Sequence, residues 1–327
     1  MANNADDDFF DGDIFIYRGG RAPEHITHAR IDKSVNEVEA DAFCKCKHLL
    51  TVETHDGIRK IGRGAFRYCT SLRRINLKSV VEIDGGAFGR CENLETVEFG
   101  DRLEIIRNDA FNACYSLKTP LKFPSILNIG HHAFIACKSL TEIELSEHIE
   151  LIGGGAFYNC KSLQRIAIPL KRYLFDDYDA REEYSPFDAC DQLTTVDLVG
   201  GIHKTVASLH MESWRTEMIS EINRINQVLP TTTYGKTDAI RQWMESLLDK
   251  MDHYEYAHYM YVEEGITLLE LALWKAKLGE KQESSEDSEE GKTKKAKVDA
   301  ESARKESRMT CGADIVIKNV LPFLELK

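Results

Sequence analysis

The sequence predicts an α/β protein in which stacked repeats form a solenoid with one curved parallel β-sheet, followed by an α-helical C-terminal domain. Three observations lead to this prediction. A motif, Ala-Phe-x-x-Cys-x-x-Leu-x-x-(Ile/Val), recurs from Ala42 to Ala156 at a nearly constant interval. A short run with apolar residues at alternate positions follows the motif, which is typical of a strand with one buried face. Beyond Gly200 the apolar residues change to helical spacing.

The repeat period is 22 or 23 residues. The motif phenylalanines stand at positions 43, 66, 88, 111, 134 and 157, so the steps are 23, 22, 23, 23 and 23 residues. A seventh, degenerate copy contains Phe187 after a step of 30 residues. A unit of this size cannot bury its own apolar face, so it stacks on its neighbours. We therefore expect about seven coils, with their strands in one parallel sheet and their phenylalanines in one internal column.

A second apolar pair precedes each motif and completes the coil. Ile58 and Ile61 are one such pair, and the second member always stands five residues before the phenylalanine. In several coils a glycine follows directly, as at Gly62, Gly130 and Gly153. Glycine in this place suits a turn, because it adopts backbone conformations that other residues avoid.

These motifs resemble the BspA-like class of leucine-rich repeats, which occurs in bacteria, protists and unicellular algae. The resemblance covers roughly residues 24–200 and rests on the Phe-x-x-Cys-x-x-Leu-x-x-Ile copies. It implies a curved solenoid whose concave face carries the parallel sheet and is used for binding. Many members of the class are secreted or exposed at the cell surface. The segments after Gly200 also resemble the helical C-terminal region of an expanded group of algal leucine-rich repeat proteins, a resemblance that implies no activity.

Charge and the first residues determine the expected location. The net charge of −12 argues against nucleic acid as the default partner. The N-terminus is acidic and has neither a basic region nor a long apolar core, so we expect no secretory signal, unlike many members of the class. No run approaches the ~18 apolar residues of a membrane span. We expect an intracellular, cytoplasmic protein that does not enter a membrane, and the basic run Lys292–Lys297 is an alternative signal for the nucleus.

The cysteines and glycines do not predict an enzyme. Seven of the nine cysteines belong to the repeat, one in each coil, which is the spacing of a small buried side chain rather than of a disulfide framework or a metal site. Gly62-Arg-Gly64 and Gly153-Gly-Gly155 lack the Lys-Ser/Thr that follows a phosphate-binding loop. We expect no catalytic activity, no cofactor and no metal.

The outward side chains of the strands form the first candidate binding surface. Alternation places Ile75 and Leu77 inward and their neighbours outward. The candidates chosen in this way are Glu53, Arg74, Asn76, Lys78, Glu98, Glu142, Glu144, Arg165 and Asp197. Such a mixed polar face either binds a partner or keeps the sheet soluble, and the sequence does not decide between the two. Pro120 cannot donate to a strand ladder, so we expect a distorted strand there.

An insertion before the last coil forms the second candidate surface. Seven extra residues fall between Leu163 and Phe187, in a segment at 169–186 that contains Tyr173, Phe175 and Tyr178 among acidic residues. Insertions in solenoids often emerge on the binding face, and clustered aromatic residues suit a partner site. The alternative is a loop that folds over the last coil.

Composition divides the chain into five segments. These are an acidic lead-in at 1–22, the solenoid at 23–200, a helical domain at 201–278, a linker with the composition of disorder at 279–308, and an apolar end at 309–327 that we expect to dock on the helical domain. Because the ends of a solenoid must be covered, we expect Ile26–Ile31 to be a capping strand.

Three helices are expected after Gly200. The first follows the apolar stripe from Met211 to Leu229, the second runs from Thr237 to Leu248, and the third runs from about Tyr254 to Leu278. Stripes of this kind either pack a helical domain on the end of the solenoid or form a surface through which two chains pair.

The function that follows is a non-enzymatic interaction module or scaffold, which binds a protein or peptide through the surface of the solenoid. Two alternatives stay open. One is a self-associating structural scaffold, a homodimer through the C-terminal helices. The other is a nuclear adaptor that uses Lys292–Lys297. The sequence names neither the partner nor the process.

Overall fold

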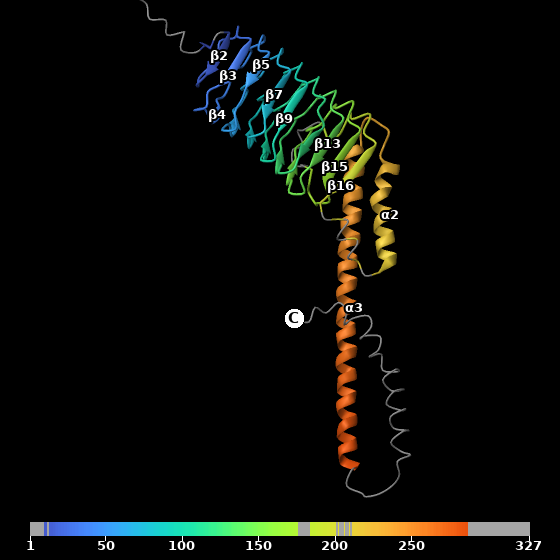
Figure 1. The fold of residues 1–327 in the computed structure, drawn as a ribbon. Coiled ribbons are helices and arrows are strands. Elements are labelled where there is room, and N and C mark those ends of the chain that lie inside the picture. The colour runs from blue at the N-terminus through green and yellow to red at the C-terminus, as the bar shows by residue number, and fades with distance from the viewer. Residues whose placement is uncertain are drawn as a thin grey trace, which may run out of the picture. The chain divides into compact units, whose positions relative to one another are not determined.

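The fold was determined as a computed structural model (Figure 1). The structure describes residues 10–11, 13–175, 184–200, 202, 206, 209 and 211–286, and it describes side chains within these ranges from residue 13 to residue 275. The chain forms two compact units, Met1–Asp249 and Lys250–Lys327. The first unit contains a parallel-strand solenoid, as the sequence predicts, followed by helical segments.

Short strands run along one side of the solenoid and form a six-stranded parallel sheet. The strands are β4 (Glu37–Val38), β6 (Lys60–Ile61), β8 (Glu82–Ile83), β10 (Ile105–Ile106), β12 (Asn128–Ile129) and β14 (Leu151–Ile152). Their second residue is the buried apolar residue five positions before the motif phenylalanine, and it lies in register from coil to coil, as in the pairing of Ile61 with Ile83.

Longer strands form the other side. They are β1 (Phe10–Asp11), β2 (Ile14–Tyr17), β3 (His28–Ile31), β5 (Thr51–Glu53), β7 (Arg74–Leu77), β9 (Thr96–Phe99), β11 (Leu121–Phe123), β13 (Glu142–Leu145), β15 (Arg165–Pro169) and β16 (Thr195–Val199). All neighbouring pairs are parallel except β1 with β2.

This side is divided, whereas the sequence predicted one sheet. The described strands form the groups β1-β2-β3-β5, β7-β9 and β11-β13-β15-β16. Between β5 and β7, the Thr54 hydroxyl donates to the carbonyl of Asn76 at 2.8 Å, so a side chain makes a bond where a ladder would have used an amide. Between β9 and β11, Pro120 stands directly before the shortened β11. Proline has no amide hydrogen to donate, so the strand ladder is interrupted there.

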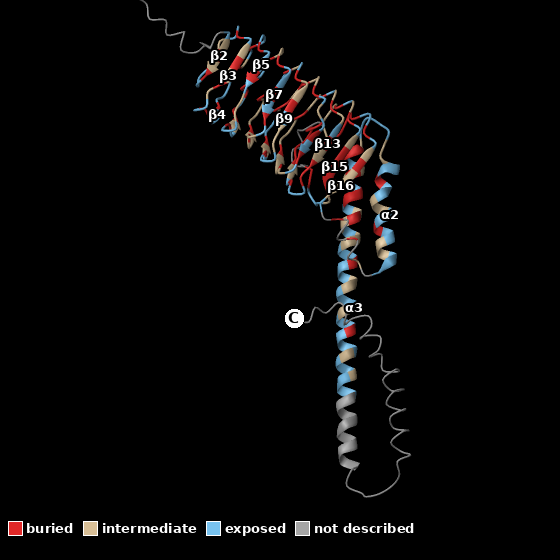
Figure 2. Ribbon diagram, viewed as in Figure 1, coloured by how far each residue is buried: buried red, intermediate tan, exposed pale blue. Residues whose placement is uncertain are grey.

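The phenylalanines form one internal column, as the sequence predicts. Consecutive rings are 5.0 to 5.6 Å apart between centroids, and their planes differ by only 3° to 7°. All seven rings are almost completely buried, and Figure 2 shows buried positions along the whole stack. Because a coil is too thin to have a core of its own, this column is the core shared by all of them.

The motif cysteines bind the coils to one another. The thiol of Cys91 donates to the carbonyl of Phe66 in the preceding coil at 3.0 Å, and Cys114 donates to Phe88 at 3.2 Å. The same bond recurs at Cys69, Cys137, Cys160 and Cys190. The described cysteines are free thiols, and all but Cys44 are buried. The prediction that they act as small buried side chains therefore agrees with their burial, and each also makes a weak hydrogen bond.

Glycine is required after the short strands for a different reason from the one that the sequence predicts. Gly62, Gly130 and Gly153 do not have positive φ angles. A Cβ atom on Gly62 would lie 2.6 Å from the carbonyl oxygen of Val38, and the other two meet the preceding coil at similar distances. Real Cβ atoms essentially never approach so closely. These positions need glycine because adjacent coils touch there.

The N-terminal end of the solenoid is covered by β1 and β2. We expected Ile26–Ile31 to be the capping strand, but β3 lies between β2 and β5 and is therefore an internal strand. Tyr17 of β2 is completely buried, and its ring lies 5.0 Å from that of Phe43 at an angle of 44°. A tyrosine thus ends the phenylalanine column, and its hydroxyl accepts a hydrogen bond from the amide of Glu39.

The other end is covered by α2 (Glu212–Val228) and the first residues of α3 (Lys236–Glu286). In each earlier coil the phenylalanine amide donates to a carbonyl of the next coil, as from Phe157 to Pro186. The last phenylalanine, Phe187, donates instead to the hydroxyl of Thr237 at 3.0 Å. The amide of Ala189 likewise donates to the carbonyl of Thr233. The segment around the start of α3 thus replaces the missing next coil.

The structure joins the second and third predicted helices. α3 continues through Asp249–His253, which contains no glycine or proline that would end a helix. It extends to Glu286, into the segment that composition assigned to a disordered linker. The rest of that linker and residues 309–327 lie outside the described part of the chain.

Replacing Gly62 with alanine should destabilise the solenoid. The new methyl group would overlap the backbone around Val38, and forcing extra atoms into a packed interior costs about 1–3 kcal/mol. Urea unfolding of the full chain measures this loss. Gly85→Ala is the matched control, since its methyl group would meet only the Asn108 carbonyl, at 3.4 Å. Equal loss in both variants would contradict the close-contact explanation.

The buried thiols of the motif cysteines predict a steep loss of the protein's stability in alkali. Burial raises the pKa of Cys190 to about 12 and that of Cys46 to about 11, and it raises the pKa of Cys114 well above its ordinary value. A raised folded-state pKa means that stability is complete below the unfolded pKa, near 9, and is lost as pH rises above it. Each buried thiol should lower the free energy of unfolding by about 1.4 kcal/mol per pH unit there.

Urea unfolding between pH 8 and 10.5 under reducing conditions tests this. The variant Cys114→Ser has one titrating thiol fewer, so its stability should fall less steeply than that of the wild type by the contribution of one thiol. Parallel curves for the two proteins would show that this thiol does not contribute.

Candidate interaction surfaces

The outward side chains of the longer strands form two rows, which we call the strand face. One row contains Glu53, Asn76, Glu98, Glu144 and Asp197, and the other contains Arg74, Glu142 and Arg165. Parallel register aligns these positions, as in the pairing of Asn76 with Glu98 and of Glu142 with Arg165. Lys78 follows directly after β7 and is exposed. The structure therefore brings the predicted polar residues to one side of the solenoid, although they are distributed over separate sheets.

Four carboxylates of the strand face are matched by cations on neighbouring coils. Lys78 lies 2.8 Å from Glu98, and Arg165 lies 2.6 Å from Asp197. Glu53 pairs with Arg30 in the same way, and Glu144 pairs with Lys122. The hydrogen bond from Lys78 lowers the pKa of the Glu98 carboxyl below its ordinary value. Arg30 and Lys122, which the sequence-based selection left out, stand in register with Glu53 and Glu144. The row therefore contains charges of both signs.

The insertion separates into an inner and an outer part. Tyr173 is 88% exposed, whereas Phe175 is only 5% exposed and its ring meets the edge of Phe187. Phe175 pairs with Ile152 of β14, so it occupies the position that an apolar residue of a short strand takes in every other coil. The prediction placed Phe175 on a partner surface, but the structure uses it as core. The extra residues follow it, and Tyr178 lies outside the described residues.

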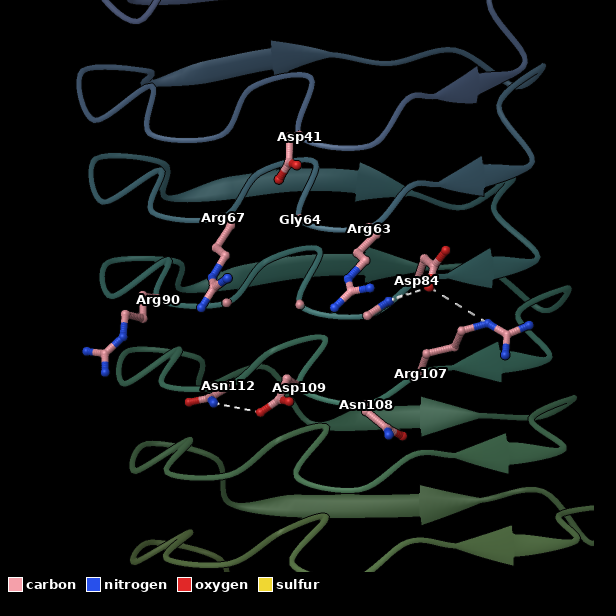
Figure 3. Close-up of a pocket in the computed structure, with 13 residues that line it drawn as sticks. Asp41, Arg63, Gly64, Arg67, Asp84, Arg90, Arg107, Asn108, Asp109 and Asn112 are labelled. Atoms are coloured by element: carbon pink, nitrogen blue, oxygen red, sulfur yellow. Dashed lines mark hydrogen bonds and ion pairs between the residues drawn. The ribbon is translucent and has the colours of Figure 1, made fainter. Parts of the chain in front are cut away.

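A groove opens on the side of the solenoid that carries the motif turns, and the sequence-based selection did not include it. It has a volume of about 880 Å³ and is lined mainly by three consecutive coils, those of Phe66, Phe88 and Phe111. The Phe88 coil carries glycine at positions 85, 86 and 89. At the positions that match Gly85 and Gly89 both neighbours carry longer side chains, Arg63 and Arg67 before and Asn108 and Asn112 after, whereas Gly64 matches Gly86 in the preceding coil. We call this gap between two walls of side chains the glycine groove (Figure 3).

Four arginines and three aspartates line the glycine groove. Arg107 is held by Glu82 at 2.6 Å and lies 3.9 Å from Asp84. Arg63, Arg67 and Arg90 differ from it, since no carboxylate among the described residues lies within ion-pairing distance of them. Arg67 and Arg90 instead lie over the ring of Tyr68, at 5.2 and 6.0 Å from its centroid. In Figure 3, Arg63 and Arg67 reach from their own coil toward the next coil, which carries Asp84.

The sequence contained a signal for this groove. We interpreted Gly62-Arg-Gly64 only as turn residues of the repeat, and asked whether they match a phosphate loop. Comparison of equivalent positions would have shown that one coil has lost its outward side chains while the coil before it has gained two arginines. The informative feature of a repeat protein is thus a departure from the repeat.

A family comparison agrees with the geometry of the coils. A model described as the BspA type leucine-rich repeat region, with 6 copies, matches residues 22–135 and 119–226. The chain belongs to the BspA-type leucine-rich repeat family. This confirms the resemblance found in the repeat motifs, while the resemblance of the C-terminal helices to algal proteins stays a prediction. A search of the curated proteins finds no match.

Solved structures of bacterial leucine-rich repeat proteins are similar to the chain. A protein from Bacteroides ovatus is 24% identical, with 53% of this chain and 55% of the other covered and a TM-score of 0.41. The T. pallidum leucine-rich repeat protein is 23% identical, with 61% and 88% covered and a TM-score of 0.38. A leucine-rich cell surface protein from Faecalibacterium prausnitzii is 19% identical, with 54% and 79% covered and a TM-score of 0.22. The match therefore spans about half of the Bacteroides ovatus chain.

The chemistry of the described residues is that of a binding surface. Within residues that the structure describes, no group of three or more His, Cys, Asp or Glu side chains is arranged to hold a metal ion. Over the same residues, no helix is long and apolar enough to cross a membrane. Burial raises the pKa of the motif thiols, so they remain protonated and unreactive near neutral pH. The repeat family and its fold are typically non-enzymatic.

Proposed function

We propose that the chain is a non-enzymatic interaction module whose solenoid binds a protein or peptide through the strand face. The observation that carries this proposal is the register of the outward rows, which places polar side chains of successive coils side by side on one surface. A ladder of this kind offers a partner one side chain from each coil. The membership of a repeat family whose domains generally mediate protein interactions supports the same role.

The ion pairs of the strand face are compatible with binding. Exposed salt bridges contribute little to stability, because water and salt screen them and two long side chains must be ordered. A partner can therefore break an ion pair such as Lys78–Glu98 and pair with its charges instead, at a small cost in stability. Complementary charges across an interface then contribute specificity and speed of association more than affinity.

Reversal of charge at Glu98 and Glu144 should weaken the partner while the chain stays folded. Both carboxylates are on the surface and their removal leaves no buried group unsatisfied. The measurement is quantitative affinity capture from native lysate with the full-length chain, comparing the wild type with E98K/E144K. The matched control is E104K/E150K, which changes the net charge equally at exposed positions away from the strand face.

The full chain is the right material because the helices complete the last coil. Residues 23–200 alone would leave the amide of Phe187 without the Thr237 hydroxyl. A partner that both double variants retain would contradict binding through the strand face. A partner that only the control retains supports it, and the swapped pair K78E/E98K would then show whether the sign of the charge at one position matters.

Self-association is a second candidate, favoured by the exposure of α3 in the second unit. Nine large apolar side chains of this helix are more than one-third exposed, namely Tyr256, Tyr259, Met260, Tyr261, Ile266, Leu268, Leu271, Leu273 and Trp274. They lie on several sides of the helix, and exposed apolar surface of this extent is typical of an interaction site. We infer that a second copy of the chain covers this stretch.

Analytical ultracentrifugation of the full chain tests this second candidate. The wild type should sediment as a dimer whose proportion rises with concentration, and L268E/L271E should shift it to monomer because a charge in an apolar interface is costly. Thr267→Glu is the control, since Thr267 is an exposed polar residue of the same helix. A wild-type monomer at all concentrations would exclude self-association.

The cytoplasmic location expected from sequence remains part of the proposal. Nothing in the described residues favours the nuclear adaptor, whose Lys292–Lys297 lies outside them.

A further inference from the structure

We propose that the glycine groove binds an acidic peptide in an extended conformation, with its carboxylates on Arg63, Arg67 and Arg90. This site is separate from the strand face. It stands or falls independently of the function proposed above, because it is built from the motif turns of three coils rather than from the outward rows of the strands.

The shape of the groove fits one extended chain. The Phe66 and Phe88 rings are 5.2 Å apart and the Phe88 and Phe111 rings are 5.0 Å apart, so the two walls belong to coils that are two steps apart. The coil between them has no side chain at Gly85, Gly86 or Gly89. A single strand occupies about 4.7–4.9 Å in the direction across its neighbours, which is the width of the missing row.

The charge of the groove fits a carboxylate-bearing ligand. Arg63, Arg67 and Arg90 are exposed and, among the described residues, have no carboxylate partner. The chain as a whole carries a net charge of −12. Three arginines without a carboxylate partner around the glycine groove are therefore a local exception to the acidic character of the protein. Guanidinium groups bind carboxylates through two parallel hydrogen bonds, and such charge-assisted bonds are about twice as strong as neutral ones.

The opposite wall suits the backbone of a peptide. The side-chain oxygen of Asn108 accepts from the amide of His131 at 3.0 Å, which leaves its NH₂ group to donate. The NH₂ group of Asn112 donates to Asp109 at 2.8 Å, which leaves its oxygen to accept. The wall thus presents both donors and acceptors, the two kinds of group that every peptide unit requires.

The aspartates of the groove limit the kind of anion. Asp41, Asp84 and Asp109 line it together with the arginines, and a ligand with closely spaced negative charges would come near these carboxylates. A nucleic acid carries a charge on every phosphate, whereas an acidic peptide can alternate carboxylates with neutral residues. The mixture of arginines and aspartates therefore favours the peptide.

Fluorescence anisotropy with two labelled octapeptides tests the proposal. The probes are fluorescein-(Glu-Ser)₄ and its neutral counterpart fluorescein-(Gln-Ser)₄, titrated with the full-length chain at low ionic strength. We expect saturable binding of the first probe only, weakened by added salt because the contacts are between exposed charges. Absence of saturable binding of the acidic probe, or equal binding of both probes, would overturn the proposal.

Two variants remove the site by different means. R63Q/R67Q deletes two of the cations, and we expect the affinity for the acidic probe to fall by about tenfold or more, as for the loss of charge-assisted hydrogen bonds. Gly85→Gln leaves the charge unchanged but fills the groove, since the equivalent residues Arg63 and Asn108 line it. Its Cβ has room, and we again expect a loss of about tenfold or more, because the extended chain would no longer fit.

The control is R102Q/K161Q, which removes two exposed cations of the solenoid that lie outside both surfaces. It should bind the acidic probe within about twofold of the wild type, because neither side chain lines the groove. An equal loss in this control would show that only net charge is sensed and would overturn the proposal. So would full binding by Gly85→Gln when circular dichroism shows it folded, or tighter binding of a single-stranded oligonucleotide of eight residues than of the peptide.

Discussion

The hydrogen bond from each motif phenylalanine to the next coil is the interaction on which the rest of the structure depends. The amide of Phe66 donates to the carbonyl of Ala87 at 2.7 Å, and the equivalent bonds from Phe43, Phe88, Phe111 and Phe134 have the same length. The bond sets the rise from coil to coil near 5 Å, which brings the rings into stacking contact. It also explains why Gly62 can have no side chain and why a cysteine thiol reaches the carbonyl of the preceding coil.

A repeating bond of this kind has to end, and the two ends solve the problem differently. At the N-terminus the amide of Ala22 still donates to the carbonyl of Ala42, and Tyr17 covers the first ring. At the C-terminus Phe187 and Ala189 have amides with no further coil to accept them, and an unpaired buried amide is costly. Thr237 and Thr233 accept these bonds. The buried Lys236 donates to the carbonyl of Leu193. The start of α3 therefore belongs physically to the solenoid.

Both proposed surfaces are variations on the constant coil. The same contacts recur in the interior of the coils, so the outward residues can differ from coil to coil without loss of the stack. On the strand face, variation places cations opposite carboxylates on the next strand. On the turns, variation removes the side chains of one coil and leaves a groove. A solenoid can carry separate binding surfaces for this reason, because each side of the coil varies independently.

The sequence by itself determined the parts of this protein that repeat. The spacing of Phe66, Phe88 and their equivalents was sufficient to predict the coil, the internal column and the burial of the cysteines, because each residue meets its own copy one period away. The outward residues of the strand face could also be chosen from alternation alone. Helical structure after Gly200 also followed from the apolar stripes, although the sequence divided α3 into two helices.

Only the tertiary structure decided where the repeat fails. It showed that Phe175 takes the place of a strand residue, since the insertion begins after it rather than before it. It showed that Lys122 compensates Glu144 and that Thr237 ends the ladder. It also showed that three glycines in one coil open a groove between two walls of side chains. Thr237 lies outside the period and the insertion interrupts it, so the motif does not place Thr237 or Phe175. Lys122 and the groove glycines stand at positions whose residue type the motif leaves open, and only the contacts show what these residues do.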